Sequence, residues 1–227
     1  MPTIRLDKVG KIYTGPSRQS AGVLDVDLTI LQGEFVFITG GHGAGKSTLI
    51  DILAGEIEPD RGRVYLGGVD VTKVGRRRGA KLRACMGMVL QDSELDPQLS
   101  VYQNMVAMER PHRIWEPGLS GLRIVKALSL VGMDRSVARL PAELTPSERR
   151  RVQLAQAIVY SPSILLLDGL TEGMDGDSAS DTVRLLAEMN DKGTTVVTTA
   201  AAGTFAGVPR RRVLKLEGGR ITSDVRR

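Results

Sequence analysis

A run of glycines followed by lysine and serine is the clearest chemical signal in this sequence. Gly40-Gly41-His42-Gly43-Ala44-Gly45-Lys46-Ser47-Thr48 has the spacing of a loop that turns its backbone N–H groups around phosphate. Lys46 can bring a positive charge to the outer phosphates, and the Ser47 hydroxyl can hold Mg²⁺. An ordinary glycine-rich turn is the alternative, but nothing in packing is expected to require Gly43, Gly45 and Lys46 together. The pattern therefore predicts nucleotide binding.

An aspartate at the end of an apolar run offers a second chemical group. Residues 163–167 are the most apolar stretch predicted as a strand, and Asp168 follows them directly. Ligands of open α/β sheets gather at the carboxyl ends of strands, where a carboxylate can hold the Mg²⁺ of a bound nucleotide. A strand-end or turn aspartate without a ligand is the alternative. The phosphate-binding pattern upstream favours the metal role.

The phosphate-binding pattern lies between a predicted strand and a predicted helix, as its mechanism requires. Residues 35–39 form a short apolar, β-branched run, and apolar residues recur at helical spacing over 49–53 until Gly55. Alternating patterns over 4–13 and 24–30 predict earlier strands. We therefore expect an antiparallel sheet that leads into an α/β core.

The remaining pattern fits one α/β domain with a helical insertion. Further strands are predicted over residues 63–66, 69–71, 86–90, 163–167, 194–199, 212–216 and 220–222. Helices are predicted over residues 100–108, 120–131, 146–160 and 178–190. We expect residues 1–91 and 161–227 to form one lobe, and residues 92–160 to form a helical lobe.

The composition is that of an ordinary globular chain with a basic balance. Its 227 residues are 41% hydrophobic and 25% charged, with a formal net charge of +5. No apolar run could span a bilayer, the first residues lack a signal peptide's apolar region, and the single cysteine fits a reducing cytoplasm. Arginine triplets begin at Arg76, Arg149 and Arg210, and we expect solvated faces there. Because aromatic residues are only 4%, nucleic-acid binding is not favoured.

The order of these motifs resembles that of ATP-binding-cassette (ABC) ATPase subunits over essentially the whole chain. Within that family the sequence is most similar to the FtsE-type cell-division subgroup, at residues 33–39, 87–92, 101–104 and 212–220. Lipoprotein-release and macrolide-export ATPases are also similar. The resemblance implies a P-loop NTPase fold, with a RecA-like α/β lobe, an antiparallel β-subdomain and a helical subdomain.

The resemblance also implies ligands and partners. The ligands would be ATP and Mg²⁺, held between two subunits in a head-to-tail homodimer, with the phosphate loop of one facing the signature of the other. An integral membrane subunit resembling FtsX would bind a groove over residues 92–105. The chain would then lie peripherally on the inner, cytoplasmic face of the cell membrane.

Several site residues match the family's motifs position by position. The resemblance implies that Tyr13 stacks on adenine, although packing on the sheet is an alternative for a strand-end tyrosine. It implies that Gln91 reaches Mg²⁺ together with Ser47 and Asp168, and that Asp175 contacts the partner subunit across the dimer.

Three positions depart from the family, and they are the ones that carry hydrolysis. The signature is Leu144-Thr145-Pro146-Ser147-Glu148, in which Pro146 has no N–H for phosphate and Thr145 with Glu148 forms a capping box. Gly169 stands where the family's general base is a glutamate, and Ala201 stands at the switch histidine. Losing a base typically costs about 10²–10⁴-fold, and losing an electrostatic donor about 10²–10³-fold.

These departures lead to one expectation and several alternatives. We expect an FtsE-like ATP-binding subunit in which hydrolysis is slow or absent. A working ABC transporter ATPase with relocated catalytic groups is an alternative, with Glu172 as the possible substitute acid, although a solvated turn residue is favoured there. A regulatory or interaction protein that no longer needs nucleotide is another, and a nucleic-acid-binding cassette is the weakest.

Overall fold

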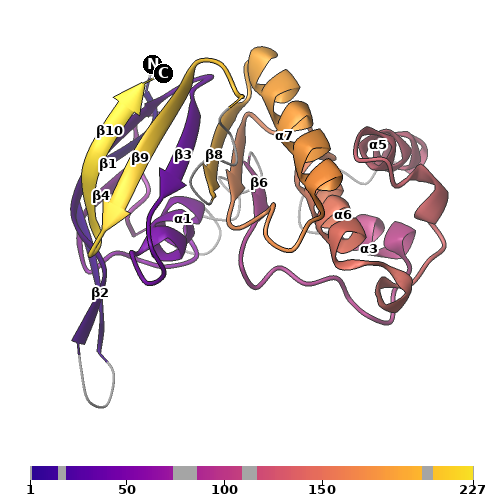
Figure 1. Ribbon diagram of the computed structural model, residues 1–227, viewed down its shortest axis with the longest axis horizontal. Helices are drawn as coiled ribbons and strands as arrows, with labels where there is room; N and C mark the ends of the chain where they lie inside the picture. Colours follow the sequence, from indigo (N-terminus) through magenta and orange to yellow (C-terminus); the bar gives the residue numbers. More distant parts are fainter. Residues whose placement is uncertain (1, 15–18, 74–85, 109–116, 201–206, 227) are drawn as a thin grey trace.

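Two β-sheets form the frame of the protein in the computed structural model, which describes residues 2–14, 19–73, 86–108, 117–200 and 207–226 (Figure 1). The smaller sheet is antiparallel, as its alternating sequence predicts, with neighbours in the order β2-β1-β4-β5. Its strands are β1 (Pro2–Thr14), β2 (Gln19–Leu31), β4 (Arg61–Leu66) and β5 (Val69–Asp70).

The larger sheet has the order β10-β9-β3-β8-β7-β6 and is parallel except for its edge strand β10. Its strands are β3 (Phe35–Thr39), β6 (Met86–Val89), β7 (Ile164–Leu167), β8 (Thr195–Thr199), β9 (Arg211–Glu217) and β10 (Arg220–Arg226). The short runs of apolar and β-branched residues in β3, β7 and β8 are typical of parallel strands that are covered on both faces. The expected α/β P-loop architecture is confirmed.

The helices lie on both sides of the larger sheet. They are α1 (Lys46–Ala54), α3 (Val101–Ala107), α5 (Pro117–Leu130), α6 (Pro146–Ile158) and α7 (Gly176–Asp191), with 3₁₀ turns η1 (Asp134–Ser136) and η2 (Pro141–Glu143). Figure 1 places α3, α5 and α6 together beyond β6, at the right of the view. None of the described helices is long and apolar enough to cross a membrane.

Alternate residues of β3 face two different parts of the hydrophobic core. Phe35 and Phe37 belong to a cluster that includes the buried faces of α5 and α6, and their rings stack with centroids 4.7 Å apart. Val36 and Ile38 belong to a second cluster, which joins α1 to the antiparallel sheet. The larger sheet therefore packs against α5 and α6 through one cluster and against α1 through the other. The expected lobe boundaries at residues 92 and 160 stay a prediction.

The strand order brings the sequence-predicted site residues to one edge of the larger sheet. The phosphate loop follows β3, Asp168 follows β7 and Gln91 follows β6 by one residue, Leu90. Thr199 ends β8, which lies between β3 and β7. Because these strands are parallel, their carboxyl ends meet at the same edge, where α/β sheets bind ligands.

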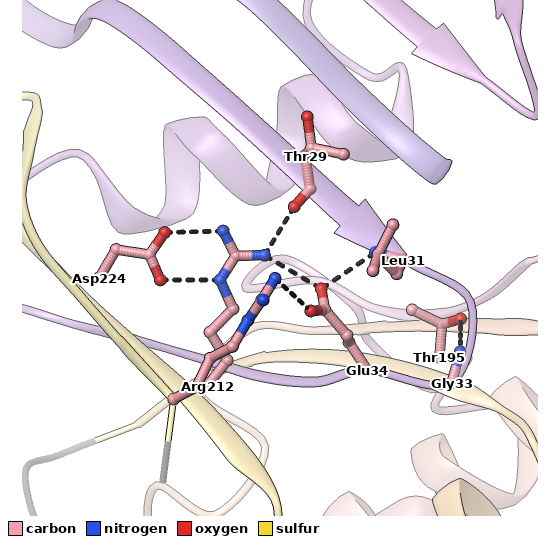
Figure 2. A network of polar contacts seen from close by, with 8 residues as sticks. Thr29, Leu31, Gly33, Glu34, Thr195, Arg212 and Asp224 are labelled. Carbon is pink, nitrogen blue, oxygen red and sulfur yellow. Dashed lines mark hydrogen bonds and ion pairs between the residues drawn. The ribbon is translucent and has the colours of Figure 1, made fainter. Parts of the chain in front are cut away.

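A buried arginine joins the two sheets (Figure 2). Arg212 of β9 is 7% exposed and makes a two-pronged contact with Asp224 of β10, at 2.7 and 2.8 Å. The same guanidinium donates to the Thr29 carbonyl of β2 at 2.6 Å and to Glu34 at 3.0 Å, and Arg226 also reaches Glu34. The prediction that this arginine triplet forms only a solvated face is therefore wrong for Arg212.

Candidate nucleotide-binding site

The predicted site residues line one open cleft of about 420 Å³ at the carboxyl edge of the larger sheet. Its lining residues are Tyr13, Gly22, His42, Gly43, Ala44, Gly45, Lys46, Ser47, Thr48, Gln91, Arg150, Asp168, Gly169 and Glu172. Most of the predicted phosphate loop thus shares a single cleft with the predicted metal residues and with the substituted position after Asp168.

Two glycines of the phosphate loop serve different purposes. Gly45, just before α1, has φ 100°, and a Cβ there would lie 1.8 Å from the Gly22 carbonyl oxygen. Packing therefore requires a glycine at position 45, in addition to any role in phosphate binding. Gly43 has φ 72° and open space around its missing Cβ. Since α1 has no side-chain cap, its first N–H groups remain available to an anion such as phosphate.

The side chains of Lys46 and Tyr13 contact opposite ends of the phosphate-loop sequence. The Lys46 ammonium donates to the carbonyls of Gly40 and Gly41, each at 2.9 Å, so its charge is held over the loop. Tyr13 lies at the end of β1 with its hydroxyl 3.4 Å from that of Thr48 and with 39% of its surface exposed. An exposed ring beside a phosphate loop can stack on a base, as the family resemblance implies.

Asp168 has the surroundings of a cation ligand. It is 5% exposed; its Oδ1 accepts from the Thr199 hydroxyl at 2.5 Å, whereas its buried Oδ2 has no hydrogen-bond partner among the described residues. A buried carboxylate oxygen without a partner is costly unless a ligand satisfies it. Ser47 and Gln91 line the same cleft and add the oxygen ligands that Mg²⁺ prefers. These residues therefore fit Mg²⁺.

An unpredicted acid on α1 adds negative potential to this site. Burial, followed by repulsion from the carboxylates of Asp168 and Asp92, raises the pKa of Asp51 to about 6. The unfolded chain ionises this group near pH 4, so its contribution to stability is fully present below pH 4 and lost as the pH rises through 6. At neutral pH the ionised Asp51 is therefore a destabilising neighbour of Asp168.

Asp51→Asn is expected to stabilise the nucleotide-free protein at neutral pH. Relative to wild type, its free energy of unfolding should rise by about 1–3 kcal/mol between pH 4 and pH 7, because the amide cannot ionise. Urea unfolding at several pH values, without Mg²⁺, measures this difference. Glu58→Gln, at an exposed acid beyond α1, is the matched control. A difference for Asp51→Asn that stays constant with pH would contradict the assignment.

The position after Asp168 is covered by a carboxylate from farther along the chain. Gly169 has φ 61°, a left-handed conformation, and its N–H donates to Thr199 at 2.8 Å. A Cβ on Gly169 would lie 3.0 Å from Oε2 of Glu172, whose own N–H closes a turn onto the Gly169 carbonyl. Glu172 is thus an exposed turn residue, as favoured from the sequence, but its carboxylate also lines the cleft. A glutamate introduced at position 169 would be strained and would meet Glu172.

The signature segment forms the N-terminal capping box of α6. The Thr145 hydroxyl accepts from the Glu148 N–H at 3.2 Å, and Glu148 accepts from the Thr145 N–H at 2.7 Å. Pro146 begins α6, and the Ser147 hydroxyl donates to Asp175 at 2.8 Å. The predicted capping box is confirmed. Both hydroxyls and two of the N–H groups that could have faced a second subunit's phosphate are already engaged within the chain.

Asp175 has a structural task within its own chain. Its carboxylate caps α7 by accepting from the Ser178 N–H at 2.8 Å and the Ser178 hydroxyl at 2.7 Å, and it also accepts from Ser147. The bonds from Ser178 and then that from Ser147 hold its pKa well below the usual range. The capping role gives no sign of the contact with a second subunit that the resemblance implies. That contact stays a prediction.

The structure adds residues that the sequence did not single out. Thr199 bridges Asp168 and Gly169, Asp51 lies near Asp168, and Arg150 reaches the cleft from α6. Only the arginine triplet gave any signal for Arg150, and we expected a solvated face there. The switch position, Ala201, lies outside the described residues.

Comparisons with known proteins agree with this geometry. The ABC transporter family model matches residues 23–172. The cell division ATP-binding protein FtsE of Mycobacterium tuberculosis is 35% identical over 226 residues, with 99% of this chain and 96% of that protein covered. FtsE of Escherichia coli K12 is 33% identical, with 98% of each covered.

A solved structure matches just as fully. The dimeric structure of a post-hydrolysis state of the ATP-binding cassette MJ0796, bound to ADP and Pi, superposes with a TM-score of 0.91 at 26% identity, with 98% of each chain covered. The residues that the family model matches include the phosphate loop and Asp168, and the solved structure superposes over nearly the whole chain. The chain therefore belongs to the ABC transporter family, as an FtsE-like ATP-binding domain.

Proposed function

We propose that this chain is the nucleotide-binding subunit of an ABC-type membrane complex in cell division, and that it holds Mg-ATP with slow or absent hydrolysis. One observation carries the proposal: a phosphate cradle with Lys46 and Asp168 in place lies beside Gly169, which has no side chain to activate water. The phosphate cradle, Lys46 and Asp168 are the groups that ATP binding needs. Gly169 cannot supply the general base that rapid hydrolysis needs.

The signature segment, residues 144–148, also supports slow turnover, because it offers few groups to ATP bound by a second subunit. In the family, this segment reaches the γ-phosphate held by the other subunit. Here Pro146 has no N–H, and the hydroxyls of Thr145 and Ser147 serve the cap of α6 and Asp175. A homodimer would repeat these losses at both of its sites. ATP is then held mainly by the chain whose phosphate loop it occupies.

The proposed assembly rests on similarity to a dimeric cassette and to cell-division proteins. The MJ0796 cassette is dimeric in its solved structure, and the two relatives from Mycobacterium tuberculosis and Escherichia coli are cell-division proteins by name. We propose that two copies meet head to tail beneath an integral membrane subunit resembling FtsX, on the inner face of the cell membrane. Nucleotide binding would then bring the copies together and pull on that partner, so that the protein acts as a nucleotide-responsive scaffold.

A working ATPase with a relocated base is the second candidate, and one observation favours it. The Glu172 carboxylate lies beside the position of the substituted base, with its Oε2 3.0 Å from where a Cβ on Gly169 would lie, and Glu172 lines the same cleft. A carboxylate there could accept a proton from an attacking water, provided that the water lies within hydrogen-bond reach.

Glu172→Gln separates these two candidates. If hydrolysis is slow or absent, phosphate release should be equally slow in wild type and variant, because neither contains an effective base. If Glu172 is the base, wild type should turn over rapidly and the variant should lose about 10²–10⁴-fold. Steady-state phosphate release, with Glu188→Gln at an exposed acid outside the cleft as control, decides between them. A loss of about 100-fold or more confined to Glu172→Gln would overturn our proposal.

A further inference from the structure

The three consecutive arginines in the first half of α6, residues 149–151, have two different roles. Arg149 donates to the Pro141 carbonyl at 2.9 Å, and Arg151 donates to the Ser178 hydroxyl at 2.7 Å. Both therefore hold neighbouring segments of the fold. Arg150 instead lines the nucleotide cleft, together with Lys46 and Asp168.

A buried glutamine fixes the position of Arg150. The guanidinium donates to Gln153 Oε1 at 3.1 Å, and Gln153, which is 8% exposed, donates through its own amide to the Ser93 carbonyl at 2.5 Å. Ser93 in turn accepts from the Leu90 N–H, directly before Gln91. The arginine is thus connected, bond by bond, to the segment that follows β6 at the edge of the cleft.

The charge of Arg150 is not neutralised by a close ion pair. None of the described carboxylates lies within 4 Å of its guanidinium, although Arg139 and Arg212 both have such partners. A half-buried guanidinium that keeps unused N–H donors in a phosphate-binding cleft suits a polyanion, because its planar fork matches phosphate oxygens. The loop and Lys46 approach from β3 and α1, whereas Arg150 approaches from α6.

We propose that Arg150 binds the terminal phosphate of ATP held by its own chain. The phosphate loop would hold the inner phosphates, so that only the outermost phosphate extends toward α6. ADP lacks that phosphate, so that with ADP bound Arg150 would stay hydrogen-bonded to Gln153. Arg150 would thus report which nucleotide is bound and connect α6 to it, within one subunit. This inference rests on the proposed ATP-binding function and names a further residue of the same site.

The ratio of ATP to ADP affinity tests the proposal. Arg150→Gln should weaken Mg-ATP binding by about 10–100-fold and leave ADP binding within about twofold, since only ATP loses a charge-assisted contact. Arg149→Gln removes the same charge one residue away and should change neither affinity. Titration calorimetry with ATP and with ADP gives both constants, and equal melting temperatures show that each variant is folded.

Three results would overturn the proposal. If Arg150→Gln weakens ATP and ADP equally, the arginine contributes only general positive potential or local structure. If it changes neither affinity while wild type binds ATP, the residue does not reach the nucleotide. In both cases the proposed ATP-binding function would stand. If wild type itself binds no ATP, the proposed function fails, and this inference fails with it.

Discussion

Replacing Lys46 by alanine should weaken ATP binding by about 100-fold or more, because the variant loses charge-assisted bonds to the outer phosphates. The ammonium is already held over the loop by the carbonyls of Gly40 and Gly41, so binding needs little rearrangement of the side chain. Calorimetric titration of wild type and variant with Mg-ATP measures the loss.

Lys192→Ala is the matched control for that loss. Lys192 is an exposed lysine at the end of α7, far along the chain from the phosphate loop, and its removal should leave ATP affinity unchanged. Unchanged affinity in Lys46→Ala would instead favour an interaction protein that has no use for nucleotide. It would also remove the basis for the roles assigned to Asp168 and Arg150.

Arg212→Met should lower the free energy of unfolding by about 3 kcal/mol, because it removes the buried cation that pairs with both Glu34 and Asp224. The guanidinium joins β2, β9 and β10 through Thr29, Glu34 and Asp224. Arg212 also holds the pKa of Asp224 below its usual range through its hydrogen bonds. The stabilisation from this pair is therefore present above about pH 4 and lost as the pH falls through the lowered pKa.

Urea unfolding of Arg212→Met at neutral and acidic pH measures both effects. The difference from wild type should shrink in acid, as Asp224 becomes protonated. Arg210→Met, in the same triplet but at an exposed position, should stay within about 0.5 kcal/mol of wild type. Equal stability of the Arg210 and Arg212 variants would show that the buried network does not hold the two sheets together.

Local patterns were sufficient to predict much of the fold. The phosphate loop, the strand before it and the capping box of Thr145 and Glu148 each depend on residues only a few positions apart. The family resemblance implied a RecA-like α/β lobe, but the order of the strands in the larger sheet came only from the structure. The strands' burial on both faces removes any period-2 pattern, so their pairing could not be worked out from the residues.

The features that the sequence did not predict depend on contacts between residues far apart in the chain. Thr199 lies 31 positions from Asp168, and Gln153 lies 60 positions from the carbonyl that anchors it, so no local pattern connects them. The arginine triplets look alike in sequence, yet Arg212 is buried in an ion-pair network and Arg150 lines a cleft. Gly45 was assigned to phosphate binding alone, but the approach of Gly22 also requires it.

We propose that this chain holds ATP without turning it over rapidly. Equilibrium ATP binding and steady-state phosphate release, measured on one preparation with and without Mg²⁺, test it most directly. We predict tighter ATP binding with Mg²⁺, and phosphate release at least about 100-fold slower than in an ABC relative with a glutamate at the position of Gly169. Turnover at that relative's rate, or no ATP binding at all, would contradict the account.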